Sequence, residues 1–254
     1  MSIKTFRGGA HPSERKDRSQ HAPIEKVSSV PQVVIPVNQH FGAPIQPLIK
    51  VGDFVRLGQK IADAEGRMTV PIHASIAGVV KKIEPRMQSN NIEGLCIVIE
   101  PKDTPEGESD REFMPPLDPF ACRKEEALAR IREAGIIGMG GAGFPAHVKL
   151  APTKPISLVI ANAAECEPYL TIDERTLLEM PDKIIDGLSI VMKIINASEG
   201  IIAIEENKKY TIPLVQKAIE ENPQVKAGMK IGIQVLKTKY PQGGEKMLIT
   251  AITG

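Results

Sequence analysis

The sequence predicts an all-β unit followed by an α/β domain with a largely parallel sheet. Short β-rich runs, punctuated by Gly, Pro and Asp, fill residues 30–101. Strands alternate with helical periodicity over 124–254, which is typical of an α/β domain. A stretch rich in Pro, Gly, Asp, Glu and Ser separates the two patterns at 102–123 and indicates a linker. With 254 residues and 42% hydrophobic content, the chain can form two cores.

The segment before the all-β unit, residues 1–29, is polar and basic and has no periodicity. We expect an extended N-terminal arm, either laid over a domain or without fixed structure. The arm lacks the apolar stretch of a secretory signal. No segment of the chain reaches the ~18 uninterrupted apolar residues of a membrane span, so any work at a membrane would be that of a peripheral subunit.

Individual elements follow from the local pattern. In the all-β unit we expect strands at 33–37, 50–55, 70–74, 78–83 and 95–99. In the α/β domain we expect helices at 124–134, 181–196, 210–221 and 243–252, with strands at 157–161, 200–204 and 229–236.

Composition excludes several classes of function. The net charge is +1, so the charge balance does not indicate a nucleic-acid binder, and with no Trp and few aromatic residues the chain lacks the stacking platforms of a single-strand binder. Cys96, Cys122 and Cys166 are isolated and odd in number, which fits a reducing compartment. The five histidines have no metal-ligand spacing, so we predict no metal site.

The most informative segment is a glycine loop at residues 138–149, which reads Gly-Met-Gly-Gly-Ala-Gly-Phe-Pro-Ala-His-Val-Lys. Backbone without Cβ atoms can turn several N–H groups toward one phosphate. The loop matches neither the dinucleotide fingerprint in its usual setting nor the P-loop spacing. On glycine content alone, a phosphate cradle and a structural turn therefore both remain open.

Two further segments follow predicted strands, where parallel sheets bind ligands. The acidic loop, residues 162–169, reads Asn-Ala-Ala-Glu-Cys-Glu-Pro-Tyr, and the helix-entry loop, residues 240–245, reads Tyr-Pro-Gln-Gly-Gly-Glu. Alone, Glu165 and Glu167 could simply solvate a loop. Negative neighbours raise the pKa of a thiol, so we interpret Cys166 as a packing residue rather than a nucleophile.

Part of the all-β unit resembles a known family. Residues 51–62 and 71–80 are similar to the two halves of lipoyl and biotinyl domains. Those domains carry a modified lysine on the hairpin between the halves, whereas residues 66–69 here read Gly-Arg-Met-Thr. The resemblance implies a lipoyl/biotinyl-like flattened β-barrel that serves as structure or docking surface, without swinging-arm chemistry.

The order of the three loops resembles the flavin- and NADH-binding subunit of respiratory complex I, which implies a Rossmann-like α/β domain at 124–254. A barrel placed before that domain resembles the C subunit of the Rnf complex, an ion-translocating ferredoxin:NAD oxidoreductase. This second resemblance spans essentially the whole chain, including Thr-Phe-Arg-Gly-Gly at 5–9 and Pro-Ile-His-Ala-Ser at 71–75.

The resemblance implies FMN and NAD as cofactors, with hydride transfer performed by the flavin and no catalytic side chain. Glu165, Glu167 and Glu245 would orient the ribityl and nicotinamide groups, Lys149 would oppose the phosphate, and Phe144 could stack on adenine. The cofactor-binding set that it implies is Gly138, Gly140, Gly141, Ala142, Gly143, Phe144, Lys149, Asn162, Glu165, Glu167, Tyr240, Gly243 and Glu245.

The family also implies partners and a location. These are the other Rnf subunits, NAD(H) and, indirectly, ferredoxin, at the cytoplasmic side of the cell membrane. The 4Fe–4S clusters expected in the family have no cysteine motif here, so the chain looks like a fragment truncated at its C-terminal end. Alternatives are a soluble NADH-dependent flavoprotein reductase and a flavin-free docking subunit.

The chain departs from the complex I pattern at three positions. Met139 stands where the complex I protein has an arginine, and Ala164 and Gly244 stand where it has acidic residues. These departures imply fewer charged groups around the flavin. The reduction potential of the flavin and the affinity for the nucleotide both depend on those charges.

Overall fold

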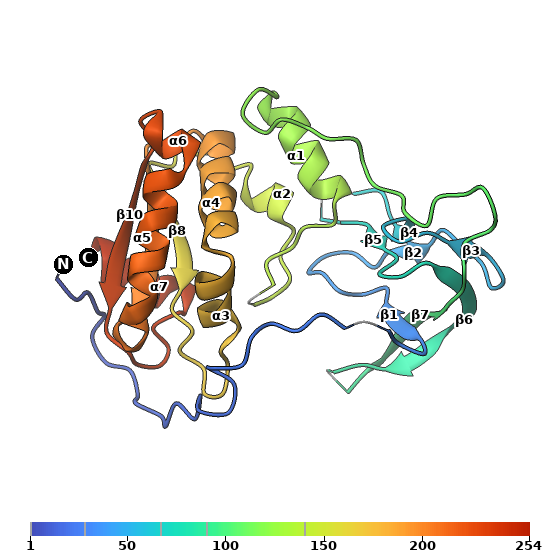
Figure 1. Cartoon of the computed structure of the whole chain (residues 1–254), viewed down its shortest axis with the longest axis horizontal. Helices are drawn as coiled ribbons and strands as arrows, with labels where there is room; N and C mark the ends of the chain where they lie inside the picture. Colours follow the sequence, from blue (N-terminus) through green and yellow to red (C-terminus); the bar gives the residue numbers. More distant parts are fainter. Residues whose placement is uncertain (1, 28, 67, 90, 140) are drawn as a thin grey trace. The chain divides into compact units, whose positions relative to one another are not determined.

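The computed structural model describes residues 2–27, 29–66, 68–89, 91–139 and 141–254. They form two compact units (Figure 1). The barrel unit is Val27–Thr153, and the α/β unit combines the chain up to Lys26 with Lys154–Gly254. These bounds differ from the predicted ones, because the arm belongs to the α/β unit and residues 124–153 belong to the barrel unit.

Two antiparallel sheets form the barrel unit, which confirms the predicted flattened β-barrel. One sheet has the order β1-β7-β6-β3 and the other the order β2-β4-β5. Fully buried aliphatic side chains such as Val55, Ile61, Val80, Ile97 and Ile99 fill the space that the sheets enclose. The strands are β1 (Val33–Pro36), β2 (Gln46–Pro47), β3 (Phe54–Val55), β4 (Lys60–Asp63), β5 (Ile72–His73), β6 (Gly78–Met87) and β7 (Glu93–Pro101).

Helix α1 (Lys124–Glu133) belongs to the barrel unit because its last turn is bonded to the barrel. Arg132 Nη2 lies 2.9 Å from Asp63 Oδ1 and donates to the carbonyl oxygen of Ala64 at 2.9 Å and to Thr69 Oγ1 at 3.2 Å. At the helix end, Gly135 has a φ of 70°, and a Cβ there would lie 2.5 Å from the carbonyl oxygen of Pro71. Only glycine permits this close approach.

The α/β unit has a parallel sheet in the order β10-β9-β8. Apolar side chains of α3, α4 and α5 cover one face, and α7 and Phe6 of the arm cover the other. This confirms the predicted α/β class. The strands are β8 (Leu158–Ala163), β9 (Glu199–Glu205) and β10 (Lys230–Leu236). The helices are α3 (Ile172–Glu179), α4 (Pro181–Ile195), the 3₁₀ helix η1 (Glu206–Thr211), α5 (Ile212–Glu221), α6 (Pro223–Lys226) and α7 (Glu245–Thr253).

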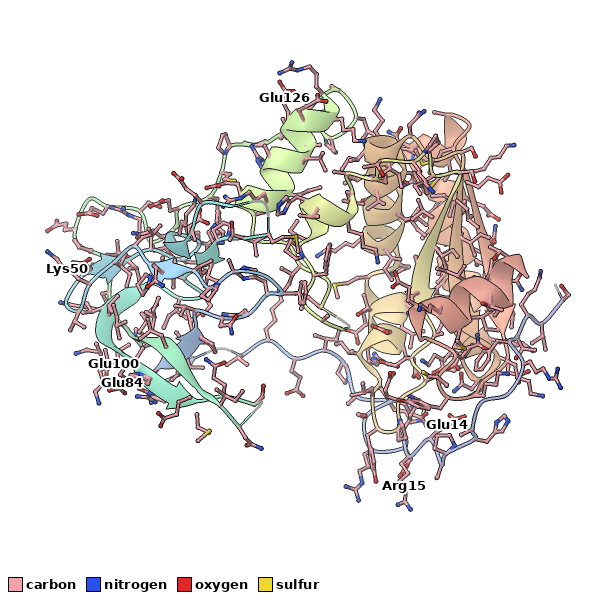
Figure 2. All side chains as sticks on the ribbon, turned by 180° about the vertical axis from the view of Figure 1, so that it is seen from behind. Glu14, Arg15, Lys50, Glu84, Glu100 and Glu126 are labelled. Atoms are coloured by element: carbon pink, nitrogen blue, oxygen red, sulfur yellow. The ribbon has the colours of Figure 1, made fainter. Side chains whose placement is uncertain are left out.

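The N-terminal arm extends this sheet. The N–H of Lys4 donates to the carbonyl oxygen of Val235, and the N–H of Lys237 donates to that of Lys4, both at 2.9 Å. Further along, Ala10 pairs with Tyr240. Figure 2 labels Glu14 and Arg15, where the arm bends on the α/β unit and the Arg15 side chain points to solvent.

Within the described residues, we find no helix with both the length and the apolar character that a bilayer crossing needs.

Candidate functional site

The glycine loop of the barrel unit is closed at its base and open at its tip. The N–H of Gly138 donates to the carbonyl oxygen of Phe144 at 2.9 Å. Gly140 lies outside the described residues. Gly141 and Ala142 are exposed, and a Cβ on Gly141 would meet open space. Met139, Gly141 and Ala142 lie in a turn. Exposed backbone in such a glycine-rich turn fits the oxygens of a phosphate.

The end of the glycine loop is attached to the barrel. The N–H of Phe41 donates to the carbonyl oxygen of Gly143 at 2.9 Å, and the rings of Phe41 and Phe144 stack with centroids 6.0 Å apart. Gly143 has a φ of 64°, which favours glycine. Lys149 is exposed at the end of the one-turn helix α2 (Ala146–Lys149). The barrel therefore holds the loop while its tip stays accessible.

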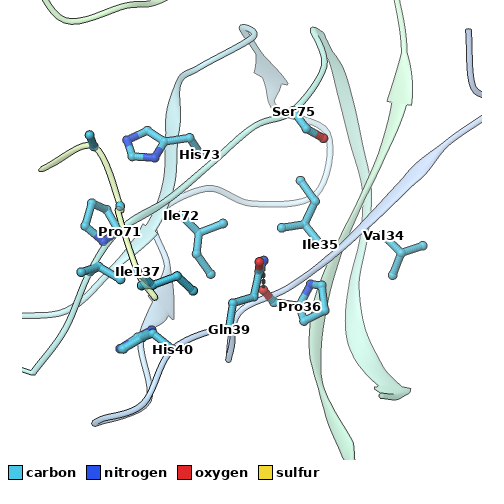
Figure 3. Close-up of a pocket in the computed structure, with 13 residues that line it drawn as sticks. Val34, Ile35, Pro36, Gln39, His40, Pro71, Ile72, His73, Ser75 and Ile137 are labelled. Carbon is cyan, nitrogen blue, oxygen red and sulfur yellow. Dashed lines mark hydrogen bonds between the residues drawn. The ribbon is translucent and has the colours of Figure 1, made fainter. Parts of the chain in front are cut away.

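A cavity of about 360 Å³ lies beside the base of the glycine loop within the barrel unit (Figure 3). Its lining includes His40, His73 and Ser75 together with Gly135 and Ile137. Burial lowers the pKa of both imidazoles, which favours their neutral forms.

In the α/β unit, the acidic loop and the helix-entry loop are bonded to each other. Asn162 Nδ2 donates to the carbonyl oxygen of Gly243 at 2.8 Å, and the N–H of Gly243 donates to Cys166 Sγ at 3.4 Å. A Cβ on Gly243 would lie 2.3 Å from the carbonyl oxygen of Ala164. The missing Cβ is what allows the two loops to touch.

Glu165 is buried, with 3% of its surface exposed, and both its carboxylate oxygens are engaged within the chain. Oε1 accepts from the N–H of Asp173 at 2.8 Å, and Oε2 lies 3.1 Å from Lys208 Nζ. Lys16 Nζ, from the arm, lies 3.9 Å from the same Oε2. Glu165 therefore holds the acidic loop in place from within the unit.

The other predicted polar residues face solvent. Glu167, Tyr240 and Glu245 are exposed, so their side chains are accessible to a ligand. Asn162 is exposed as well, but its amide is bonded to Gly243 and Ala164. The predicted site residues divide between the two units: the glycine loop belongs to the barrel unit, and the acidic and helix-entry loops belong to the α/β unit.

Sequence reasoning missed a buried polar layer beneath the acidic loop. Lys16 and Lys208 are 5% and 1% exposed, although lysine is normally a surface residue. Glu205 is fully buried; burial raises its pKa to about 7, and its Oε2 has no partner among the described residues. Both amide atoms of the buried Gln242 are likewise without a partner in that part of the chain.

Cys166 agrees with its interpretation as a packing residue. Burial is the largest cause that raises the pKa of its thiol, and the charges of Glu167 and Glu205 add to it. Among the described residues, no group of three or more His, Cys, Asp and Glu is arranged to hold a metal ion.

Two family models match the chain. Residues 4–104 match the RnfC barrel sandwich hybrid domain, and residues 131–254 match the Nuo51 FMN-binding domain. The chain thus combines a barrel domain with an FMN-binding domain, which is the domain content of a flavoprotein subunit. A chain of an NAD⁺-reducing NiFe hydrogenase superposes with a TM-score of only 0.46, at 27% identity over 52% of this chain and 24% of that one. The family assignment therefore rests on sequence.

Sequence identities to curated proteins identify the family within this class of flavoprotein subunits. The C subunit of the proton-translocating ferredoxin:NAD(+) oxidoreductase complex of Clostridium ljungdahlii is 43% identical over 99% of this chain and 54% of its own length. Its counterpart in the Na(+)-translocating complex of Acetobacterium woodii is 38% identical over 100% and 56%. The corresponding protein of the Vibrio cholerae ion-translocating oxidoreductase complex is 40% identical over 98% and 31%. The chain belongs to the RnfC family and spans about half the length of the first two relatives.

Proposed function

We propose that this chain is the FMN- and NAD(H)-binding part of the RnfC component of an ion-translocating ferredoxin:NAD oxidoreductase. In this role it passes electrons between NAD(H) and 4Fe–4S clusters bound outside these residues, and through them to or from ferredoxin. Other subunits of the complex would hold it at the cytoplasmic face of the membrane. The match to an FMN-binding domain supports the cofactor, and the glycine loop with its exposed tip at Gly141 and Ala142 carries the proposal.

The residues present fit FMN. Gly140, Gly141, Ala142 and Gly143 would lie against the phosphate, Gly138 would close the loop beneath it through its bond to Phe144, and the Lys149 ammonium would oppose the phosphate charge. Within the α/β unit, the exposed side chains of Asn162, Glu167, Tyr240 and Glu245 would contact the ribityl and nicotinamide groups. When bound, the flavin supplies hydride exchange with the nicotinamide and one-electron exchange with the clusters.

The protein's own contribution is orientation. Hydride transfer requires closely stacked rings, so groups that fix the two ligands lower the barrier by pre-organisation. Glu165 would act from beneath the acidic loop, through its bonds to Lys208 and Asp173, and Gly243 would let the helix-entry loop lie against the acidic loop.

A substitution at the tip of the glycine loop tests the phosphate cradle. A side chain on Gly141 meets open space, so Gly141→Asp adds a negative charge without a clash, and Gly141→Asn is the neutral control of equal size. We expect Gly141→Asp to weaken FMN binding at least tenfold in a fluorescence titration, and Gly141→Asn to weaken it much less.

Riboflavin, which lacks the phosphate, provides a second control. Its affinity should be equal in both variants. If wild-type protein binds no FMN, or if Gly141→Asp weakens riboflavin as much as FMN, the phosphate cradle is wrong.

A further inference from the structure

Lys16 lies beneath the acidic loop with three carbonyl oxygens around its ammonium. Its Nζ donates to the carbonyl oxygens of Glu165 and Glu167 at 3.0 Å and to that of Leu170 at 2.5 Å. An ammonium has three N–H donors, so these carbonyls satisfy it completely. A single arm residue thus draws the backbone of the loop toward one point.

The loop does not need Lys16 to neutralise Glu165. Lys208 already lies 3.1 Å from Oε2, whereas Lys16 lies 3.9 Å from it. Burial lowers the pKa of Lys16, and the neighbouring charge of Lys208 lowers it further. Burying a charged Lys16 beside Lys208 is unfavourable, and the bonds from its ammonium to the three carbonyl oxygens offset this cost. Through these bonds Lys16 orients the carbonyl groups.

Neighbouring arm residues fasten the same loop. The N–H of Tyr169 donates to the carbonyl oxygen of Glu14 at 2.9 Å, and Thr171 Oγ1 donates to Ser19 Oγ at 2.9 Å. Tyr169 has a φ of 69°, a left-handed conformation that costs a non-glycine residue on the order of 1 kcal/mol. The contact with Glu14 helps to hold that strained conformation.

The inward carbonyls have an outward consequence. With the backbone oxygens of residues 165, 167 and 170 turned to Lys16, the Glu167 and Tyr169 side chains are exposed. Glu167 is one of the residues proposed to contact the nicotinamide and ribityl groups. The arm lies outside residues 131–254, which the FMN-binding domain model matches.

We infer that Lys16 is a positioning residue of the nucleotide site, and that the N-terminal arm is thereby part of that site. The inference rests on the proposed function for the identity of the ligand. Lys16 sets the conformation of the acidic loop from beneath and makes no contact with the ligand itself.

The test compares two buried arm-binding lysines in the chain of 254 residues. Lys16→Met removes the ammonium and keeps the aliphatic stem. Lys239→Met is the matched control: Lys239 is also buried, and its Nζ donates to the carbonyl oxygens of Phe6 and Gly8, but not to the acidic loop. Both variants weaken the attachment of the arm, so an effect of Lys16→Met alone isolates the acidic loop.

Two measurements follow, both at temperatures well below the melting of either variant. We expect hydrogen exchange of the amides at 165–171 to be at least tenfold faster in Lys16→Met, and near wild type in Lys239→Met. In an equilibrium titration followed by NADH fluorescence, the Kd should rise at least tenfold in Lys16→Met and by less than threefold in the control.

Equal effects of the two substitutions on exchange and on NADH affinity would overturn the inference. A wild-type chain that binds neither FMN nor NADH would instead overturn the proposed function, while faster exchange in Lys16→Met would still support the hold on the loop. Should Lys16→Met not fold, Lys16→Arg replaces it, because a planar guanidinium cannot direct its donors at three carbonyls around one point. The same directions of change are then expected.

Discussion

The ion pair between Lys208 and Glu165 offers a direct test of what holds the acidic loop. Lys208→Met keeps the aliphatic stem and removes an ammonium that is 1% exposed and lies 3.1 Å from Glu165 Oε2. The carboxylate then faces Lys16 at 3.9 Å and keeps the N–H of Asp173. Breaking a buried pair costs about 3–5 kcal/mol, and the remaining partners place this variant near the lower end, at about 3 kcal/mol.

The assay is urea unfolding at pH 7, followed by circular dichroism at 222 nm, with the slope m checked for constancy. Lys217→Met is the control, since Lys217 lies 3.8 Å from Glu221 in an exposed pair and should change stability by less than about 0.5 kcal/mol. The double variant Lys208→Met/Glu165→Gln removes both charges and should lose less than the sum of the single losses by about 2 kcal/mol.

Two results would refute this reasoning. One is a Lys208→Met variant as stable as the control. The other is strict additivity in the double variant, which would mean that the two charges do not interact.

Three further predictions concern other parts of the molecule. Burial raises the pKa of Glu205 from 4.5 to about 7, so its contribution to stability is full below pH 4.5 and falls by about 3 kcal/mol as the pH rises through 7. The urea midpoint of the wild-type chain should therefore fall between pH 5 and pH 8, and Glu205→Gln should reduce that fall. An equal fall in the variant would contradict the raised pKa of Glu205. Gly243→Ala should destabilise the chain by about 1–3 kcal/mol in thermal unfolding, because the added Cβ meets a backbone oxygen. Its control, Gly187→Ala, adds a Cβ in open space within α4 and should stabilise the chain by about 0.5–1 kcal/mol. Similar changes in melting temperature for the two variants would contradict the close approach at Gly243. Arg132→Met should destabilise the barrel unit by about 2 kcal/mol. Burial raises the pKa of Asp63, but Arg132 holds that pKa below its usual value. An NMR titration of the variant should therefore show a higher pKa for Asp63 than in the wild-type chain.

Elements with a strong hydrophobic pattern were predictable from the sequence. The helix expected at 181–196 is α4 (Pro181–Ile195), and the strands expected at 200–204 and 229–236 are β9 and β10 with ends shifted by one residue. Long apolar runs that pack on both faces of a sheet leave a clear signal. In contrast, β2 is only Gln46–Pro47, too short to show any alternation, and the polar start of α3 at Asp173–Arg175 conceals a helix just before Pro181.

The site divides in the same way. The glycines and the acidic loop are visible in the sequence, because special backbone conformations and exposed carboxylates leave a local pattern. Lys16 and Lys208 leave none, since a buried lysine is defined by its partner. For Lys16 that partner is Glu165, 149 positions further along the chain, and no spacing rule reaches so far. Glu205 was predicted only as the end of a strand, and its raised pKa arises from tertiary burial.

The α/β unit is assembled from two separate pieces of the chain, with all of the barrel unit between them. During synthesis, Lys4 emerges long before Leu236, beside which it forms the edge of the sheet. The barrel unit, continuous in sequence, can fold once Thr153 has left the ribosome, while the arm waits without a partner. The arm and β10 are separated by most of the chain, and contacts between such distant segments form slowly. The arm, which is made first, therefore pairs with the strand that is made last. A nascent chain stalled before β10 would therefore carry a folded barrel and an arm whose Lys4 has no strand to pair with.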